Sequence, residues 1–479
     1  MKFSLAAKDD ISRFTKYPNA FSNIEHTVFW HKQKSLYKLN RPPLTRDATF
    51  DLCIIGGGYT GLWTAILAKQ MNPLIRIAVL EAQEIGDGAS GRNGGFLQHS
   101  LTHGINQGES RFAPELATLE KLGLANFKEI EEFILKHRLE CDFERVGAID
   151  LAKTNSQVQQ LQKTFEALRR YGHEAKLLDK NEVFETIHSN SFLGGLKSPA
   201  TTALIDPYKL TVGLARHATT LGVEIFEHSR ASEIKNFNNR MLVSVDTHSI
   251  LTHRVVVATN VDTSLIRALK KYIVPIYDYI LVTEPLSKGD LKSIGWEQRQ
   301  GLAEASNQFH YFRLTSDNRI LWGGFDAIYH YGSKVNAKYD SRPESTGRLA
   351  DNFFETFPQL THIKFSNAWS GTIDTCTRFA PFFGTKYGGK AAYALGFTGL
   401  GVCATRFAAK VIVDLLYDTR SPVLKMNYVK RKPLPFPVEP FRSIAIAITK
   451  QSLANADSND GRENTWLRLI SKIGFGFDS

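Results

Sequence analysis

The feature that most constrains this chain is a glycine-rich turn between a short apolar run and a helical segment. Residues 50–55 are apolar except for one aspartate, a pattern typical of a buried parallel strand. Residues 56–61 then read Gly-Gly-Gly-Tyr-Thr-Gly and match G-x-G-x-x-G. Residues 62–71 and 77–80 have the patterns of a helix and a second strand. Strand, helix and strand with tight joints predict a βαβ unit.

Each residue type in this unit suits a dinucleotide. Gly56 permits the tight turn, Gly58 lets a pyrophosphate approach the backbone, and Gly61 allows the helix to pack closely on the strand. The helix N-terminus offers N–H groups and the positive end of a dipole. Glu81 ends the second strand, where a carboxylate accepts hydrogen bonds from ribose hydroxyls; the alternative is a solvated acid. The predicted nucleotide site comprises Gly56, Gly58, Tyr59, Thr60, Gly61, Glu81 and Ala82.

A second loop of small residues distinguishes an FAD-binding chain from an NAD-binding one. Residues 88–96 read Gly-Ala-Ser-Gly-Arg-Asn-Gly-Gly-Phe, and six of these nine are Gly, Ala or Ser. Backbone with so few side chains can lie against a bulky planar ligand. A simple NAD-binding domain does not need such a loop at this place in the chain. The loop favours FAD, and a flexible surface loop is the alternative interpretation.

The positive charge of the chain lies mainly at its two ends. Of the net charge of +11, residues 1–50 carry +5 and residues 421–479 carry +4. A nucleic-acid-binding domain would carry such charge on its folded body, so no nucleic-acid partner is expected. The ends are predicted to be solvated or docked extensions, with an anionic membrane surface or acidic partner as the less favoured explanation.

Composition and cysteine usage indicate an ordinary globular protein from a reducing compartment. The 479 residues are 43% hydrophobic and 22% charged, which excludes a largely disordered or fibrous chain. Cys53, Cys141, Cys376 and Cys403 have no disulfide-framework or zinc-site spacing, so we expect no metal and a cytoplasmic location. Charged residues near the N-terminus predict that it is not a secretion signal, and no apolar run of about 18 residues is present, so no transmembrane helix is expected. Membrane contact is likewise not expected.

The remaining patterns predict an α/β protein with two domains. Residues 223–225, 255–257 and a strand–glycine–helix pattern at 392–416 extend the first, Rossmann-like sheet, and 208–221 is a helix candidate. Residues 113–186 have helical spacing, and alternating β-formers at 272–331 predict an antiparallel sheet in an α+β domain. The predicted boundaries are a discontinuous FAD-binding domain (46–110, 195–265, 366–425), a substrate domain (111–194, 266–365), and extensions at 1–45 and 426–479, the latter packed on the body.

These motifs together resemble those of a known enzyme family. The glycine turn, Glu81 and residues 88–95 resemble the D-amino-acid oxidase superfamily of FAD-dependent amine oxidoreductases, which includes glycine oxidase and sarcosine oxidase. Among its branches, the gamma-glutamylputrescine oxidoreductase-like enzymes are the most similar, and the similarity runs from about residue 20 to 425. The tail motifs 435–440 and 474–479 resemble a bacterial subset. Matching motifs in the expected order lie at 206–207, 257–260, 283–286, 311–313, 323–324, 369–371 and 396–401.

The resemblance implies a glutathione-reductase-type FAD-binding domain and a role for each matching residue. The ribityl chain and isoalloxazine ring would contact Ser90, Arg92, Asn93, Gly94 and Gly95. Further cofactor contacts would come from Ala231, Thr259, Asn260, Gly371, Thr398, Gly399, Leu400 and Gly401.

The resemblance also implies the chemistry. A substrate C–H would deliver hydride to flavin N5, and water would hydrolyse the resulting imine. The reduced flavin would then pass its electrons to oxygen, with peroxide formation, or to an electron carrier. A dry site lowers the pKa of a substrate amine, so we hypothesise that no single acid–base side chain is essential. The alternatives are a dehydrogenase acting on a hydroxy acid or other non-amine substrate and a non-catalytic flavin-binding protein.

Departures from the family pattern bear on the substrate and on the flavin link. Leu400 and Cys403 stand where sarcosine-oxidase relatives have a histidine and a carboxylate-binding lysine, which disfavours simple N-methyl amino acids. Cys376 does not match the offset of a flavin-tethering cysteine, so non-covalent FAD is expected. The candidate substrate contacts are Tyr311, which is otherwise a core aromatic, and Arg313, which is otherwise a surface arginine. His310 is expected to be structural, and Asp326 and Asp374 to be turn acids or ammonium contacts.

Overall fold

The βαβ unit forms where the glycine turn predicts it. The computed structural model describes residues 11–472, and in it β1 (Ala48–Ile55), α3 (Tyr59–Met71) and β2 (Ile77–Leu80) follow one another, with the two strands parallel. β11 (His248–Val257) and β8 (Glu224–Phe226) extend the sheet on either side, so the predicted strands at 223–225 and 255–257 are confirmed, the first of them shifted by one residue.

The first sheet has the order β18-β19-β11-β1-β2-β8, and all its neighbours are parallel except β18 and β19. The predicted strand–glycine–helix pattern near the C-terminus is confirmed as β19 and α11. β9 and β10 form an antiparallel meander, in which β10 pairs with the first half of β11. The second half of β11 pairs with β19. The bounds are β9 (Ala231–Phe237), β10 (Arg240–Val245), β18 (Phe382–Lys386), β19 (Ala391–Leu395) and α11 (Gly401–Tyr417).

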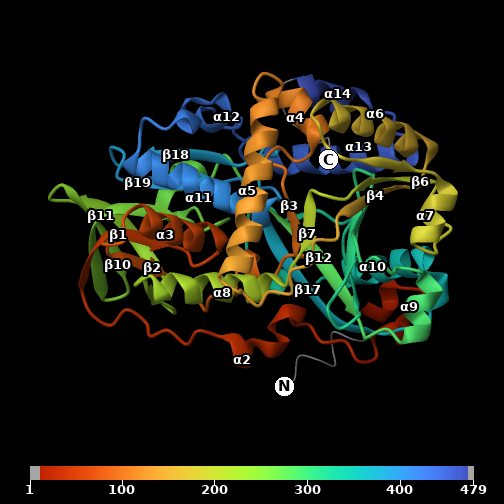
Figure 1. Ribbon diagram of the computed structural model, residues 1–479, viewed down its shortest axis with the longest axis horizontal. Coiled ribbons are helices and arrows are strands. Elements are labelled where there is room, and N and C mark those ends of the chain that lie inside the picture. Colours follow the sequence, from red (N-terminus) through yellow and green to blue (C-terminus); the bar gives the residue numbers. More distant parts are fainter. Residues whose placement is uncertain (1–10, 473–479) are drawn as a thin grey trace.

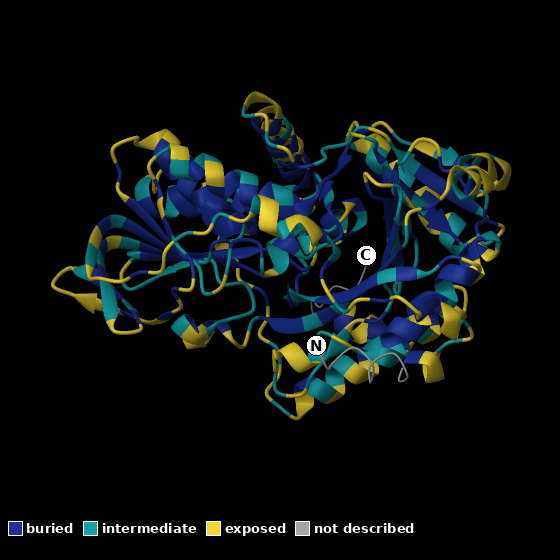
Figure 2. Ribbon diagram, turned by 90° about the horizontal axis from the view of Figure 1, so that it is seen from below, coloured by how far each residue is buried: buried dark blue, intermediate teal, exposed yellow. Residues whose placement is uncertain are grey.

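Both faces of this first sheet are covered, which explains why its strands are apolar at nearly every position. Leu52 and Ile54 of β1 face a helical layer, whereas Cys53 and Ile55 face the meander. The helical layer contains α3, α11, α5 (Leu116–Lys136) and α8 (Pro207–Thr220). Figure 2 shows both sheets as buried through their centres.

A nine-stranded sheet lies beside the first one (Figure 1). Its order is β16-β12-β15-β14-β13-β4-β6-β5, and β17 pairs along the whole length of β12. The pairs are antiparallel except β4 with β13, so the predicted antiparallel sheet is in detail a mixed one. The bounds are β4 (Ala148–Ala152), β5 (Lys176–Leu178), β6 (Gly194–Ser198), β12 (Val274–Thr283), β13 (Gly301–Glu304), β14 (His310–Leu314), β15 (Ile320–Gly324), β16 (Ile328–Tyr329) and β17 (Phe365–Thr375).

Helices and a small two-stranded sheet complete the body. α10 packs on one face of the nine-stranded sheet, the far face, where it shares a core with the side chains of Phe312 and Trp322. The segment 113–186 is not wholly helical, because β4 and β5 interrupt it. The remaining bounds are α4 (Ile105–Phe112), α6 (Asn155–Arg170), α7 (Lys180–Thr186), α9 (Lys288–Ile294), α10 (Pro343–Thr356), β3 (Phe96–Gln98) and β7 (Thr202–Leu204).

Three elements lie outside the domain in which the sequence boundaries place them. β6 and β17 pair within the nine-stranded sheet, although residues 195–198 and 366–375 are predicted to belong to the FAD-binding domain. α5 packs on the first sheet's helical layer, although its residues are predicted to belong to the substrate domain. The predicted boundaries at 195 and 366 fall inside β6 and β17, where no turn or linker composition marks them.

The N-terminal extension is docked along both domains. Figure 1 shows it, in red, along the lower edge of the molecule beneath both sheets. Thr15 donates to Asp351 of α10 at 2.7 Å, and Glu25 exchanges backbone hydrogen bonds with the β17 region. The segment includes the short helices η1 (Ser12–Phe14), η2 (Pro18–Phe21), η3 (Phe29–Gln33) and α2 (Lys34–Tyr37).

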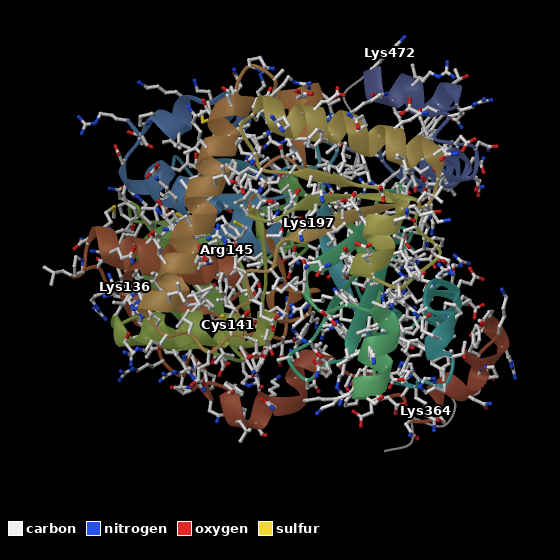
Figure 3. The ribbon with its side chains drawn as sticks, turned by 45° about the vertical axis from the view of Figure 1, so that its right-hand side comes forward. Lys136, Cys141, Arg145, Lys197, Lys364 and Lys472 are labelled. Atoms are coloured by element: carbon white, nitrogen blue, oxygen red, sulfur yellow. The ribbon has the colours of Figure 1, made fainter. Side chains whose placement is uncertain are left out.

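The C-terminal extension is held to the body by apolar and polar contacts: Tyr428 and Val429 are buried in the core of the helical layer. Asp457 accepts backbone hydrogen bonds from Asn307 and Gln308 at 3.0 and 2.9 Å. The segment 444–448 is helical, and Ile444 and Ile448 in it are exposed. Lys472, the last described residue, lies at the surface where α14 ends (Figure 3), and the motif at 474–479 lies outside the described residues. The elements are α12 (Asn427–Lys430), α13 (Phe441–Ser458) and α14 (Thr465–Lys472).

Among residues 11–472, no helix is both long and apolar enough to cross a membrane.

Candidate active site

The glycine turn brings three backbone segments so close that side chains are excluded. Gly56 has φ +110°, and a Cβ there would lie 2.3 Å from the Ala258 carbonyl oxygen at the end of β11. A Cβ on Gly61 would lie 2.0 Å from the carbonyl oxygen of Gly56. At Gly58 it would lie 2.8 Å from the Ser90 hydroxyl. Gly56 and Gly61 thus have the steric roles that the sequence motif predicts, and the pyrophosphate contact of Gly58 stays a prediction.

Glu81 lies directly beside this turn. Its Oε2 accepts the Gly57 N–H and its Oε1 accepts the Gln83 N–H, both at 2.9 Å. Burial raises the pKa of Glu81, and these backbone hydrogen bonds oppose the rise. Ser229 donates its N–H to the Glu81 carbonyl, which brings the chain that enters β9 at Ala231 to the same strand end. Ala231 therefore lies near the strand end that carries Glu81, and its contact with the cofactor stays a prediction.

We call residues 88–96 the flavin loop. Asn93 donates to the carbonyls of Ala89 and Ser90 and accepts the Gly95 N–H, so the loop is cross-linked internally. From outside, Trp30 donates to the Asn93 carbonyl at 2.9 Å and Trp369 donates to the Arg92 carbonyl at 2.8 Å. These bonds anchor the loop to the body, and only Gly88 of its nine residues is exposed, so it does not lie open on the surface.

A further glycine turn precedes α11. Asp374 accepts the N–H groups of Gly396 and Phe397, and Thr398 has φ +50°. Leu400 is the N-cap residue of α11 and makes no side-chain cap hydrogen bond. A Cβ on Gly399, or on Gly371 of the nine-stranded sheet, would meet no atom within 4 Å. Open space therefore borders these two glycines.

Thr259 and Asn260 directly follow β11, at the same edge as Gly56. The Thr259 hydroxyl donates to the Asp262 carbonyl, and the Asn260 amide donates to the Thr372 carbonyl at 3.4 Å. Their side chains tighten this strand end.

The residues present fit FAD. The glycine turn, the flavin loop and the turn before α11 all lie at carboxyl ends of parallel strands, where open α/β sheets bind ligands. α3 also has no side-chain N-cap, so its dipole end is available to a pyrophosphate. At Gly56, Gly61, Gly371 and Gly399 the backbone itself borders the site, because these positions lack side chains.

One face of the nine-stranded sheet is turned toward the flavin loop. The strand register places Asp278 opposite Gly371 and Tyr311 opposite Gly323. Alternate residues of the same strands, such as Tyr277 and Phe312, lie in the core on the other face. We call the side that carries Asp278, Tyr311, Arg313, Gly323 and Gly371 the substrate face.

Tyr311 and Asp278 form a hydrogen-bonded pair on this face. The Tyr311 hydroxyl donates to Asp278 Oδ2 at 2.5 Å, and the Gly324 N–H donates to Oδ1 at 3.1 Å. A Cβ on Gly94 of the flavin loop would lie 2.6 Å from the Tyr311 ring, so loop and face are in contact. Burial raises the pKa of Asp278 to about 6, although the Tyr311 hydrogen bond opposes the rise, and it raises the pKa of Tyr311 well above 10.

Arg313 is buried, so the alternative of a surface arginine is wrong. It is 1% exposed, and its guanidinium donates to the carbonyls of Gly95, Ile205 and Leu314. Burial lowers its pKa to about 10. Arg313 therefore links the substrate face to the flavin loop through backbone atoms, and a direct contact with substrate stays a prediction.

The other candidate residues have structural partners. His310 lies on the far face, stacked on Trp322, which agrees with the structural role expected for it. Asp326 is buried in an ion-pair cluster with Arg348 and Lys450. Burial raises the pKa of Asp374 to about 7, although the backbone N–H groups that it accepts oppose the rise. Asp326 and Asp374 are thus held by the protein itself, as turn or buried acids.

The Cys376 thiol lies within a core cluster. It donates toward the Ala380 carbonyl at 3.2 Å, and burial raises its pKa. This enclosure agrees with the expectation of non-covalent FAD.

Sequence reasoning missed Asp278, Trp30 and Trp369. Asp278 interrupts an otherwise apolar strand, Tyr277 to Val282, and that single charge was a usable signal. Trp369 lies in the matching motif at 369–371, but neither its contact with the flavin loop nor that of Trp30 could be predicted, because both side chains come from segments distant in sequence.

Comparisons with known proteins agree with this geometry. Residues 51–415 match the family model described as "DAO: FAD dependent oxidoreductase". The chain is 29% identical to gamma-glutamylputrescine oxidoreductase of Escherichia coli, over 82% of this chain and 89% of that protein. It is 27% identical to the probable oxidoreductase OrdL of Haemophilus influenzae, over 83% and 89%.

Solved structures share the fold. Glycine oxidase from Geobacillus kaustophilus superposes with a TM-score of 0.64 at 19% identity, covering 82% of this chain and 98% of that one. L-Proline dehydrogenase from P. horikoshii superposes with a TM-score of 0.63 at 20% identity, covering 80% and 97%. The glycine turns, the flavin loop and the match to more than three quarters of the chain's length together show that this chain belongs to the DAO family of FAD-dependent oxidoreductases.

Proposed function

We propose that this protein oxidises a C–N bond of an amine or amino acid and passes the electrons to oxygen or to an electron carrier. The observation that carries the proposal is the Asp278–Tyr311 pair on a face directly in contact with the flavin loop. A relative that shares 29% of its residues is named for oxidoreduction of a putrescine derivative. FAD, when bound, supplies the two-electron acceptor for such a reaction.

Asp278 is the group suited to a cationic nitrogen. Amines are protonated at neutral pH, and a partly buried carboxylate both attracts the ammonium group and accepts its proton. With a pKa near 6, Asp278 is largely ionised at pH 7, and the Tyr311 hydroxyl fixes the orientation of its Oδ2. The pair positions the nitrogen rather than serving as an indispensable base, because a dry site by itself favours the neutral amine.

Two further parts of the chain support the reaction. The uncapped N-terminus of α11, after Gly399, presents N–H groups and a positive dipole end to negative charge. Gly371 leaves the substrate face open opposite Asp278, which gives a substrate room, whereas the Tyr311 ring occupies the space beside Gly323. The expected cytoplasmic location is supported by four buried cysteines, none of which forms a disulfide.

Anaerobic substrate screening tests the proposal. The purified flavoprotein is mixed, without oxygen, with amines, polyamines, amino acids and hydroxy acids, and bleaching of the visible flavin absorbance is recorded. We expect bleaching with at least one amine or amino acid and none with hydroxy acids. Bleaching by hydroxy acids alone would instead support a dehydrogenase acting on alcohols and would overturn the proposal.

A further inference from the structure

Two histidines and a glutamate from distant parts of the chain converge at one point. His99 follows β3, Glu120 lies in the second turn of α5, and His173 follows α6. The Nε2 atoms of His99 and His173 lie 3.0 and 2.8 Å from Glu120 Oε2. The three residues are 8%, 5% and 7% exposed, respectively. None of them belongs to the glycine turns, the flavin loop or the substrate face.

The convergence on a single oxygen resembles a set of metal ligands. A carboxylate has two oxygens, yet both imidazoles contact the same one, Oε2. The three candidate ligand atoms lie within 4.8 Å of one another. In a tetrahedral zinc site with bonds of about 2.05 Å, ligand atoms lie roughly 3.3 Å apart. Movements of a few tenths of an ångström at the two short pairs, and somewhat more between the imidazoles, would admit an ion.

The backbone holds these side chains in place. The His99 N–H donates to the Thr201 carbonyl, and the His173 N–H donates to the Leu168 carbonyl at 3.0 Å. α5 passes so close to His99 that a Cβ on Gly123 would lie 2.4 Å from the His99 carbonyl oxygen. Gly123 is about one turn after Glu120, so this close approach delivers the carboxylate to the two rings. The ligands are therefore positioned before any ion binds.

We propose that His99, Glu120 and His173 bind one divalent transition-metal ion, with zinc as the best fit. Two imidazole nitrogens and one carboxylate oxygen suit zinc and its neighbours cobalt and nickel, whereas calcium and magnesium require mostly oxygen ligands. Three protein ligands leave the fourth tetrahedral position to water. Each neutral imidazole offers its Nε2 lone pair and carries its proton on Nδ1.

The ion would tie the chain leaving the flavin loop through β3 to α5 and to the end of α6. It is a stabilising site, separate from the oxidation chemistry, and the inference does not depend on the proposed substrate. It departs from the sequence-based expectation of no metal, which rested on cysteine spacing alone. His99 and His173 lie 21 and 53 positions from Glu120, too irregular a spacing to form a recognisable motif.

Metal titration of the flavoprotein tests the site. The FAD-loaded protein is stripped with a chelator and titrated with Zn²⁺ by calorimetry, and its thermal midpoint is followed. We expect one saturable ion per chain and a higher midpoint with zinc. His99→Gln and His173→Gln keep a polar side chain but lose the imidazole ligand, and each should weaken zinc binding at least about 100-fold. His137→Gln is the matched control, because the half-buried His137 ring packs at a tilt against His217, away from the cluster, and its loss should leave zinc binding unchanged.

Cobalt provides a readout that needs no variant. Co²⁺ added to the stripped wild-type protein should give the intense visible bands of a tetrahedral site, and Zn²⁺ should abolish them. No saturable zinc binding, or binding equally strong in His173→Gln, would overturn the proposal and leave the cluster as a hydrogen-bonded structural unit.

Discussion

The glycine turns and the substrate face are built in opposite ways. The turns are local: Gly56, Gly58 and Gly61 lie within six residues, and each is required because a neighbouring atom occupies the place of a side chain. The substrate face is assembled from β12, β14, β15 and β17, which span about a hundred residues, and it carries its chemistry on side chains. Under the proposed function, cofactor binding depends on backbone shape, whereas substrate choice depends on a few side chains that strand alternation brings together.

The largest effect is expected from a side chain placed in the turn. In Gly61→Ala the new Cβ would lie 2.0 Å from the Gly56 carbonyl oxygen, which the backbone cannot accommodate without moving α3 away from β1. FAD affinity should fall at least about 100-fold, measured as the flavin retained on gel filtration and by titration of apoprotein.

Two variants keep this prediction specific. Gly58→Ala meets only the Ser90 hydroxyl, at 2.8 Å, and should cause a smaller loss of affinity with the fold intact. Gly289→Ala in α9 meets Ser287 at an ordinary 3.6 Å and should bind FAD normally. If Gly61→Ala bound FAD as tightly as Gly289→Ala, the backbone account of the cofactor site would be wrong.

The second prediction concerns the substrate face. Asp278→Asn should retain FAD but lower kcat/KM for the amine about 10- to 100-fold, because a charged hydrogen bond to the substrate nitrogen is lost. In the wild type, kcat/KM should fall as the pH drops through about 6, since Asp278 becomes protonated there, and this limb should be absent from the variant.

Asp317→Asn is the control for this variant, since Asp317 pairs with Arg319 in an exposed turn of the same sheet. If Asp278→Asn had an unchanged kcat/KM that still fell at low pH, the Asp278–Tyr311 pair would not contact the substrate.

The third prediction concerns the place where the two regions join. β17 runs from the nine-stranded sheet to Asp374, which holds the turn before α11. Because the pKa of Asp374 is raised to about 7, the folded state binds its proton more tightly than the unfolded state. This group therefore makes stability fall as the pH rises from about 4 to about 7, by up to about 1.4 kcal/mol per pH unit.

Asp374→Asn removes this titration. The thermal midpoint of the wild type, measured relative to the variant at several pH values, should decrease across that window. A difference that is constant with pH would show that Asp374 titrates near its ordinary value.

The smallest effect is expected from the N-terminal extension. Trp30→Phe keeps an aromatic ring but loses the hydrogen bond to the Asn93 carbonyl. A bond of this kind contributes about 1 kcal/mol, so FAD affinity should fall about fivefold. Trp296→Phe loses a comparable bond to Gln300, remote from the flavin loop, and should leave FAD affinity unchanged. Equal affinities of the two variants would mean that the extension does not support the loop.

The sequence predicts the two regions to different depths. The positions of β1, α3, β2, β11 and α11 follow from apolar runs and glycine positions, because each signal is complete within about ten residues. The extents of the domains do not follow, because β6 and β17 enter the second sheet without any turn or linker at the predicted boundary.

Within the site, the backbone contacts are more predictable than the side-chain contacts. Gly56 and Gly61 reveal their roles through spacing alone, whereas Asp278 acquires its role from pairing with Tyr311, 33 positions away. Arg313 shows the same limit, since nothing local distinguishes an exposed strand arginine from one buried against the Gly95 and Ile205 carbonyls.

The most direct test of the account is a crystal structure of the flavoprotein with an unreactive amine. The account predicts that the flavin ring lies against Gly94 and Gly95, with the nitrogen of the amine within hydrogen-bonding distance of Asp278. A ring bound elsewhere, or an amine held away from this carboxylate, would contradict it.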